Sequence, residues 1–192
     1  MKKIILLFGL IISVSAFSQN KEVLKNINNV RFYGVDYSKV KVYSAGESAS
    51  QFKDAFEDIN YLFISEPKKY NPAKLFKKNV LSIELEPVVS NIRKIDLEKL
   101  KTVTQTSNDL SQADLENVLK SLSIEPTEEP GLIIIAEFID KPKNRGWYNI
   151  VFFDTKTKKI IDTWKGSGKA AGFGLRNFWA ASVYKVMKDV KL

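Results

Sequence analysis

The sequence predicts an α+β fold: a single domain with an antiparallel or mixed sheet, a C-terminal three-strand meander, a Gly-rich loop and a packed closing helix. Two observations favour this class. Strand-like segments occur at both ends of the chain, and three of them follow one another near the C-terminus with short polar turns between. Helical segments stand apart from those strands instead of alternating strictly with them. No internal repeat or Pro-rich linker divides the chain, so we expect one domain over residues 30–192.

Residues 1–18 have the pattern of a secretory signal peptide: a positive start, an apolar run and a small-residue cleavage site. Ala16 and Ser18 are the small residues, and cleavage after them leaves Gln19 first. The alternative is an uncleaved anchor, but the apolar run is shorter than the ~20 residues of a transmembrane helix. We therefore expect export to the periplasm or the exterior, with a flexible polar lead-in over residues 19–29.

The first half of the domain contains two expected strands. Residues 30–37 carry apolar side chains at strand spacing, and Val40 and Val42 extend this strand past a bulge. In residues 80–88 apolar and polar side chains alternate, which is typical of a half-buried strand. Residues 90–109 show no clear periodicity, and no element is assigned to them.

Three helices are expected before the C-terminal third. Ser48 and Gln51 form a capping box at the start of a helix with one apolar face. Asn71, which precedes a proline, starts a short helix that ends near Lys78. Ser111 caps a third helix, whose buried stripe consists of Leu115, Val118, Leu119 and Leu122.

The C-terminal third gives the meander. Its strands are expected at residues 132–139, 147–153 and 159–164, and antiparallel pairing follows from the short turns. A Gly-rich loop over residues 166–174 leads into the final helix. The apolar face of that helix consists of Trp179, Val183, Val186, Met187 and Val190.

The chain contains neither histidine nor cysteine. This excludes Ser–His–Asp and Cys–His nucleophilic catalysis, ordinary zinc sites and disulfides. We expect no cofactor and no bound metal. The formal net charge of +8 is spread along the chain, and it suits either solubility or attraction to acidic partners. No nucleic-acid-binding motif occurs, so we expect no nucleic-acid partner.

With imidazole and thiol absent, a carboxylate pair is the first enzymatic hypothesis, as in glycan hydrolases. Glu137 is the weak catalytic candidate, because it lies in an apolar strand with Ile135 and Ile139 expected on its own face. The candidates for a second carboxyl are Asp140, Glu84 and Glu86. In the alternative interpretation Glu137 is solvated or pairs with a cross-strand lysine such as Lys165.

The Gly-rich loop matches a nucleotide-binding pattern only superficially. Gly166, Gly168 and Ala171 fit G-x-G-x-x-A, but the chain reaches its last helix where an acidic ribose ligand would have to follow. A Walker-type loop fails as well, since Lys169 is followed by Ala170. We therefore interpret these glycines as serving a tight turn and close packing.

A cluster of cations is a candidate ligand-binding site. In a meander, the first turn and the exit of the third strand lie at the same end of the sheet. The residues that meet there are Lys141, Lys143, Arg145, Trp147, Lys165, Lys169 and Arg176. Such a set suits an anion, phosphate or glycan. The alternatives are a solvated hairpin loop and a Trp147 that belongs to the core.

The segment Val151–Phe152–Phe153–Asp154, with its turn and the following Trp164–Lys165–Gly166, resembles small secreted Gram-negative proteins of unknown function. More remotely it is similar to extracytoplasmic domains of the CsgG and TolB N-terminal type. The resemblance covers the C-terminal third. It implies a compact α+β domain used in envelope assembly or protein contacts, and it supplies no catalytic residues. This chain lacks the lipidated cysteine of those lipoproteins.

The sequence therefore predicts an exported, non-catalytic envelope or secreted domain that binds a partner protein or an acidic envelope component. Two alternatives stay open. One is a carboxylate-dependent glycan hydrolase centred on Glu137. The other is an anion- or glycan-binding module built from the 141–147 hairpin and the Gly-rich loop. The mature chain is expected to have no transmembrane segment.

Overall fold

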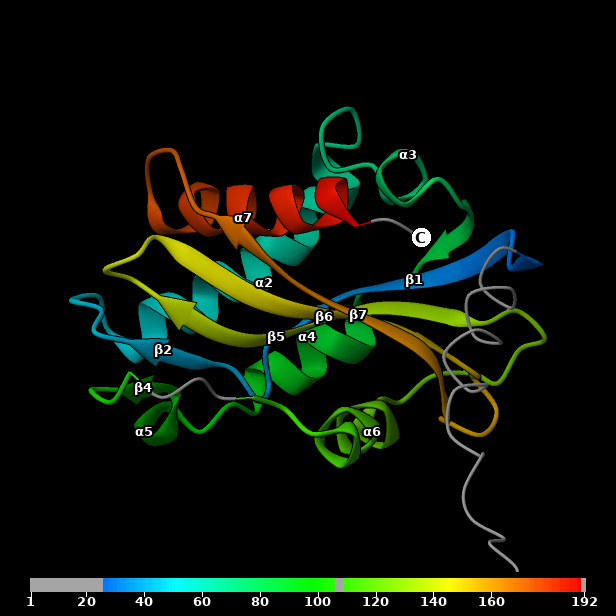
Figure 1. Ribbon diagram of the computed structural model, residues 1–192, viewed down its shortest axis with the longest axis horizontal. Helices are drawn as coiled ribbons and strands as arrows, with labels where there is room; N and C mark the ends of the chain where they lie inside the picture. The colour runs from blue at the N-terminus through cyan, green and yellow to red at the C-terminus, as the bar shows by residue number, and fades with distance from the viewer. Residues whose placement is uncertain (1–25, 106–108, 191–192) are drawn as a thin grey trace, which may run out of the picture.

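The computed structural model describes residues 26–105 and 109–190. The expected signal peptide, residues 1–18, and most of the expected lead-in lie outside the described residues. Strands β1 to β7 form a single sheet, with helices above and below it (Figure 1). Within the described part of the chain, no helix is both long and apolar enough to cross a membrane.

The elements are defined by their bounds. The strands are β1 (Asn29–Asp36), β2 (Lys41–Tyr43), β3 (Asn79–Ile83), β4 (Lys101–Thr102), β5 (Gly131–Asp140), β6 (Arg145–Phe153) and β7 (Ile160–Lys169). The helices are α2 (Ala49–Ser65), α3 (Pro72–Phe76), α4 (Glu86–Arg93), α5 (Leu97–Leu100), α6 (Gln112–Ser121) and α7 (Leu175–Asp189).

The main path of the sheet is parallel, so the prediction of an α+β fold on an antiparallel or mixed sheet is wrong. Five strands in the order β3-β1-β5-β2-β4 all pair in parallel, and the fold is α/β-like. Strands β1 and β2 follow each other along the same strand, β5, as the predicted extension past a bulge implied. Parallel pairing requires crossover connections, which the helices between these strands supply. Hydrophobic periodicity identifies strands but does not show which strands pair.

The C-terminal meander is confirmed at the other edge of β5, where β5, β6 and β7 pair in antiparallel fashion. The third strand, however, runs on to Lys169, so the expected Gly-rich loop is reduced to residues 170–174. Gly168 lies inside the strand, at a position where α7 crosses it closely. A Cβ atom at Gly168 would overlap the backbone oxygen of Ser182.

The expected strand over residues 80–88 is too long. Strand β3 ends at Ile83, and α4 begins at Glu86 with Pro87 in its first turn. Proline fits the first turn of a helix because its missing N–H has no intrahelical partner there. Val88 is fully buried, and it belongs to this helix and not to a strand. The unassigned residues 90–109 contain the rest of α4, then α5 and β4.

The predicted helix starts are confirmed. The Ser48 side chain accepts a hydrogen bond from the backbone N–H of Gln51. The Gln51 side chain in turn accepts a hydrogen bond from the backbone N–H of Ser48. The Asn71 side chain caps α3. Ser111 forms a capping box with Asp114 at the start of α6. Each cap satisfies backbone donors that the first turn of a helix leaves unpaired.

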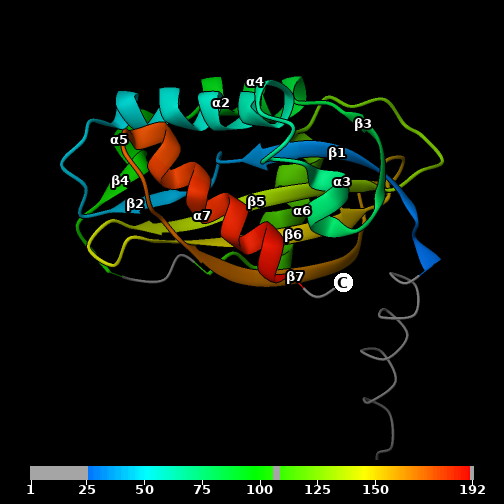
Figure 2. The ribbon, with the colours of Figure 1, turned by 90° about the horizontal axis from the view of Figure 1, so that it is seen from above.

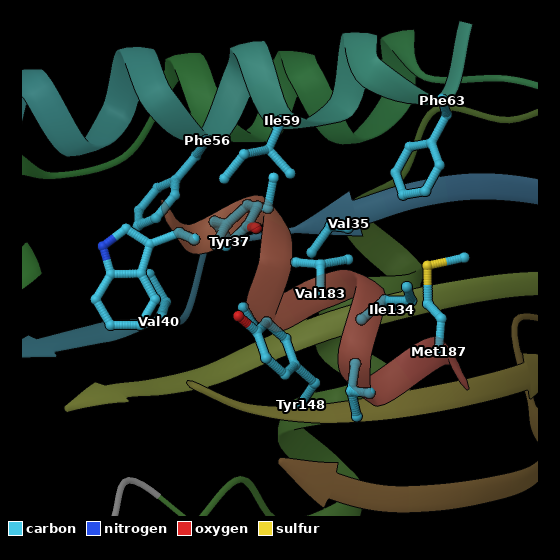
Figure 3. Close-up of a cluster of buried hydrophobic side chains, with 14 of the residues drawn as sticks. Val35, Tyr37, Val40, Phe56, Ile59, Phe63, Ile134, Tyr148, Val183 and Met187 are labelled. Atoms are coloured by element: carbon cyan, nitrogen blue, oxygen red, sulfur yellow. The ribbon is translucent and has the colours of Figure 1, made fainter. Parts of the chain in front are cut away.

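Helices α2 and α7 cover one face of the sheet and bury the larger hydrophobic core (Figures 1 and 2). Figure 3 shows side chains from both helices and from the sheet converging on this layer. The rings of Tyr37 and Phe56 stack at 4.0 Å between centroids. Val183 and Met187 of α7 are fully buried here, which confirms the predicted apolar face of the final helix.

Helix α6 covers part of the opposite face. Its predicted stripe, including Leu115, Val118 and Leu119, is buried against a second hydrophobic cluster. That cluster includes Ile133 of β5 and Val151 of β6. The apolar contacts of α6 therefore lie over the first half of β5, and polar side chains occupy the same face toward its carboxyl end.

Beyond the end of β3, a side chain of α2 takes the place of a neighbouring strand beside β1. Asn60 accepts a hydrogen bond from the backbone N–H of Val35 at 2.7 Å and donates to the carbonyl of Val35 at 2.9 Å. The preceding residue, Gly34, has φ of 83°. A Cβ atom there would overlap the Asn60 amide oxygen, so both the backbone angle and the space require glycine.

We predict that Gly34→Ala lowers the free energy of unfolding by about 1–3 kcal/mol, since it adds backbone strain and displaces Asn60. Urea unfolding followed by circular dichroism measures the change. Gly46→Ala is the matched control, because a Cβ at Gly46 has no neighbouring atom within 4 Å. Equal stabilities for the two variants would contradict this account of β1.

Candidate functional site

A β-bulge in β5 builds the candidate site. Ala136 lies opposite Tyr148 of β6, whereas the next paired residue, Phe138, lies opposite Trp147. Glu137 is therefore an extra residue in β5. A bulge of this kind bends the strand and re-aims the side chains that follow it.

The bulge changes which side chains share a face. Ile139 belongs to the core beneath α2 and α7, whereas Ile135 belongs to the cluster beneath α6. The expectation that both isoleucines flank Glu137 on one face is therefore wrong. Instead, Glu137 and Asp140 line one cavity although they are three residues apart, a spacing that regular alternation would place on opposite faces.

This cavity has a volume of about 400 Å³ and lies at the carboxyl end of β5. Its lining comes from β5, β6, β7, the β5–β6 turn and the positions on either side of residues 106–108. Its lining residues are Gln105, Asp109, Glu137, Phe138, Asp140, Lys143, Trp147 and Lys165.

Glu137 is 1% exposed and is held by several donors. The ammonium of Lys165 lies 2.8 Å from its Oε1. The side-chain amide of Asn149 donates to Oε2 at 3.0 Å, and the backbone N–H of Leu110 donates to the same oxygen at 3.4 Å. Of the alternatives left open for Glu137, the pairing with Lys165 is the one that the structure has.

Lys165 joins two carboxylates across the cavity, because its ammonium contacts Asp109 as well as Glu137. Burial by itself lowers the pKa of Lys165, but the hydrogen bonds to Asp109 and Glu137 outweigh this effect and raise the pKa. The ammonium is therefore charged at neutral pH and neutralises the buried Glu137.

Asp140 is the second buried carboxyl of the cavity, also 1% exposed. Its Oδ1 accepts from the backbone N–H of Lys143 at 3.0 Å, and the ammonium of Lys143 lies 3.4 Å from Oδ2. The side-chain amide of Gln105 reaches Oδ2 at 3.5 Å. Asp140 thus closes the β5–β6 turn and presents a paired carboxylate to the cavity.

Aromatic rings form the apolar part of the cavity. The rings of Phe138 and Trp147 lie 5.9 Å apart at 55°, and the ring of Tyr43 stacks on that of Phe138 at 6.2 Å. Trp147 is half-buried and lines the cavity, so it is not a core residue. Its position between apolar contacts and open space suits an indole that meets a ligand.

The structure separates the predicted cation cluster into two groups. Only Lys143, Trp147 and Lys165 of that set line the cavity. The remaining members are Lys141, Arg145, Lys169 and Arg176.

Most of these remaining cations have partners of their own. Lys141 forms an ion pair with Glu47 at 2.6 Å and lies over the ring of Phe178. Arg145 donates to the hydroxyl of Ser167 at 2.9 Å.

The two outermost cations are exposed. Lys169 lies directly opposite Arg145 in the β6–β7 pair, and Arg176 donates to the side chain of its neighbour Asn177 in α7. Neither residue lines the cavity, so the seven predicted residues do not all meet there.

Of the three candidates for a second carboxyl, only Asp140 lies beside Glu137. Glu84 pairs with Arg31 at 2.9 Å, and Glu86 pairs with Arg93 at 3.1 Å, both away from the cavity. Sequence reasoning missed Gln105, Asp109 and Asn149. The first two lie in the stretch without periodicity, and Asn149 interrupts the apolar pattern of β6, which is the signal that could have pointed to it.

A second cavity of about 560 Å³ adjoins the first, and Asp109 lines both. Asn91 and Ser121 line its wall and hydrogen-bond to each other at 2.9 Å. The neighbouring Asp36, fully buried at the end of β1, accepts from Asn91 at 3.0 Å. Burial raises the pKa of Asp36, because the charged carboxylate loses its water. This network ties β1 to α4 and α6.

Within residues 26–105 and 109–190, no group of three or more potential His, Cys, Asp or Glu ligands is placed to hold an ion. A scan against protein-family models and searches of curated proteins and of solved structures find no match to this chain.

We predict that Lys165→Met lowers the free energy of unfolding by about 1–3 kcal/mol, because it leaves the buried Glu137 without its ammonium. Adding Glu137→Gln should restore part of the loss, and the double-mutant cycle should give a coupling of about 0.5–3 kcal/mol. Urea unfolding of the four proteins measures this energy.

The control for this cycle is Asp109→Asn, which removes the other partner of Lys165. The side chain of Asp109 is 68% exposed. It should cost at most about 1 kcal/mol, as exposed ion pairs do. Strictly additive effects of the two substitutions in the cycle would show that Glu137 does not depend on Lys165.

Proposed function

We propose that the protein is an exported, non-catalytic binding domain whose cavity at the carboxyl end of β5 takes a sugar residue of an envelope glycan. One observation carries the proposal: two buried carboxylates, Glu137 and Asp140, each paired with a lysine, line a cavity of about 400 Å³ together with the half-buried Trp147. Fixed polar groups beside an aromatic wall are the usual composition of a small-molecule site.

The hydrogen-bonding capacity of the cavity suits hydroxyl groups. A carboxylate oxygen can accept more than one hydrogen bond, so Glu137 and Asp140, which both line the cavity, can each accept from a ligand hydroxyl. Lys143, Lys165 and Gln105 supply donors for ring and hydroxyl oxygens. A sugar hydroxyl donates and accepts at once, and the apolar face of a sugar ring can lie against the Trp147 indole.

The charge of the cavity supports a neutral ligand over an anion. Its lining residues comprise three carboxylates and two ammonium groups. A phosphate or carboxylate that approached Lys143 or Lys165 would compete with Asp140 and Glu137 for the same ammonium. An uncharged polyol leaves both pairs intact, which favours a glycan.

The arrangement supports binding over hydrolysis. Carboxylate-dependent glycosidases need one protonated carboxyl that gives its proton to the leaving group and one charged carboxyl. In this cavity Glu137 and Asp140 each face the ammonium of a lysine, which is the geometry of ion pairs. We therefore assign Glu137 a binding role, in which Lys165 and Asn149 orient its carboxylate.

Export rests on the N-terminal sequence. We predict that the protein recovered from the periplasm or medium begins at Gln19, as intact-mass spectrometry would show. Ala16→Arg should block cleavage, because the recognition site requires small residues. Asn20→Asp, beyond the cut, is the control and should be processed normally. Recovery of an unprocessed chain from the cytoplasm would contradict export. A role in envelope assembly, which the resemblance to envelope-assembly domains implies, stays a prediction.

We predict that glycan binding depends on Trp147 and Glu137. Calorimetric titration with oligosaccharides prepared from a Gram-negative envelope measures the dissociation constant. Trp147→Ala should weaken binding at least tenfold, or about 1.4 kcal/mol, because the sugar loses its aromatic wall. Glu137→Gln should weaken it to a similar degree, because the ligand loses a charge-assisted acceptor.

Arg145→Ala is the matched control, since Arg145 neighbours the cavity without lining it. It should bind as the wild type does. After the titration, the oligosaccharides are also analysed for new reducing ends. Absence of binding at millimolar glycan would contradict the proposal. Cleavage that Glu137→Gln abolishes would show a hydrolase instead.

A further inference from the structure

Four loops form one end of the molecule, which we call the loop end. They comprise residues 44–48, 103–105, 141–144 and 170–174. Backbone hydrogen bonds join them in a row: Ser44 N–H to Thr102 O, Lys141 N–H to Tyr43 O, and Ala170 N–H to Asn144 O. Figures 1 and 2 both show the carboxyl ends of β2 and β4, the β5–β6 turn and the start of α7 together at this end.

Two of these loops expose apolar side chains almost completely. Phe173 is 94% exposed and Val103 is 93% exposed, well above the 59% of Ile64 on α2. Phe173 stands between Gly172 and Gly174, whose φ angles of 110° and 75° favour glycine. The loop conformation therefore holds the phenyl ring away from the core, in water, where an isolated aromatic side chain gains nothing.

Cations surround these apolar tips. In the loop end and within two residues of it there are Lys101, Lys141, Lys143, Arg145, Lys169 and Arg176. The carboxylates of the same segments are Glu47 and Asp140, and each is already paired with a lysine. Asp140 is moreover buried. The exposed charge of the loop end is therefore positive.

We propose that the loop end docks on an anionic lipid surface, with Phe173 and Val103 entering the headgroup boundary and the cations lying on the lipid phosphates. Apolar side chains beside Lys and Arg are the combination that holds peripheral proteins at membranes, and it works through burial plus attraction to anionic lipids. A protein partner is the less favoured occupant, because the two tips lie on separate loops with polar and charged residues between them. A protein-docking surface more often has one contiguous apolar patch.

The orientation has a consequence for the cavity. Lys143 belongs both to the loop end and to the cavity lining. A chain docked by the loop end therefore holds the mouth of the cavity beside the membrane surface. The docking proposal goes beyond the proposed glycan binding and does not depend on it.

Vesicle co-sedimentation tests the proposal with the exported protein as its host processes it, after mass spectrometry has identified its N-terminus. We expect the protein to bind vesicles of phosphatidylglycerol and phosphatidylcholine, to bind pure phosphatidylcholine weakly, and to dissociate as salt rises. Phe173→Ser should lower the partition coefficient about tenfold. Lys169→Glu and Arg176→Glu should each lower it at least about fivefold, since one basic residue near an anionic surface contributes about that factor.

The matched controls are Ile64→Ser, an exposed apolar residue of α2, and Lys159→Glu, at the turn that leads into β7. Both should bind vesicles as the wild type does. Wild-type binding by the Phe173 and Arg176 variants, or no binding to anionic vesicles, would overturn the proposal. Failure to bind vesicles together with cross-linking of a protein at position 173 would assign the loop end to a protein partner. Glycan titration without vesicles keeps the two proposals separable.

Discussion

Strand β5 lies at the centre of the sheet with every residue buried, yet it carries Glu137 and Asp140. A buried carboxylate is costly unless charge and hydrogen bonds compensate it. Each of the two therefore has a lysine, and each lysine comes from the neighbouring β6–β7 part of the meander or from its turn. These pairs link β5 to β7 and to the β5–β6 turn, and their residues line the cavity.

The local elements were largely predictable, whereas their arrangement was not. Capping residues such as Ser48 and Ser111 act through neighbours in the chain, so sequence alone locates the helix starts. Parallel pairing of β1 with β5 joins segments about a hundred residues apart and leaves no local pattern. For the site, Glu137 and Lys165 were identified as a candidate pair. The bulge that brings Asp140 to the same cavity depends on the register against β6, which periodicity does not contain.

The parallel strands also explain why so much polar chemistry gathers at one end. Strands β2, β4 and β5 all end there, so their following loops meet in a row. In open α/β sheets this is the end where ligands usually bind. Helix α6 packs over the earlier half of β5, and the polar carboxyl half is left to form the cavity. The exposed apolar tips and cations of the loop end lie just beyond it.

The most direct test of the central claim is to locate the ligand by NMR. If a sugar lies between the two paired carboxylates and the indole, an envelope oligosaccharide should shift the indole N–H signal of Trp147 and the side-chain amide signals of Asn149 and Gln105. Signals from Asn91 and Ser121, in the second cavity, should not move. Shifts confined to the second cavity, or no shifts at saturating glycan, would contradict the assignment of Glu137 and Asp140 to a sugar-binding site.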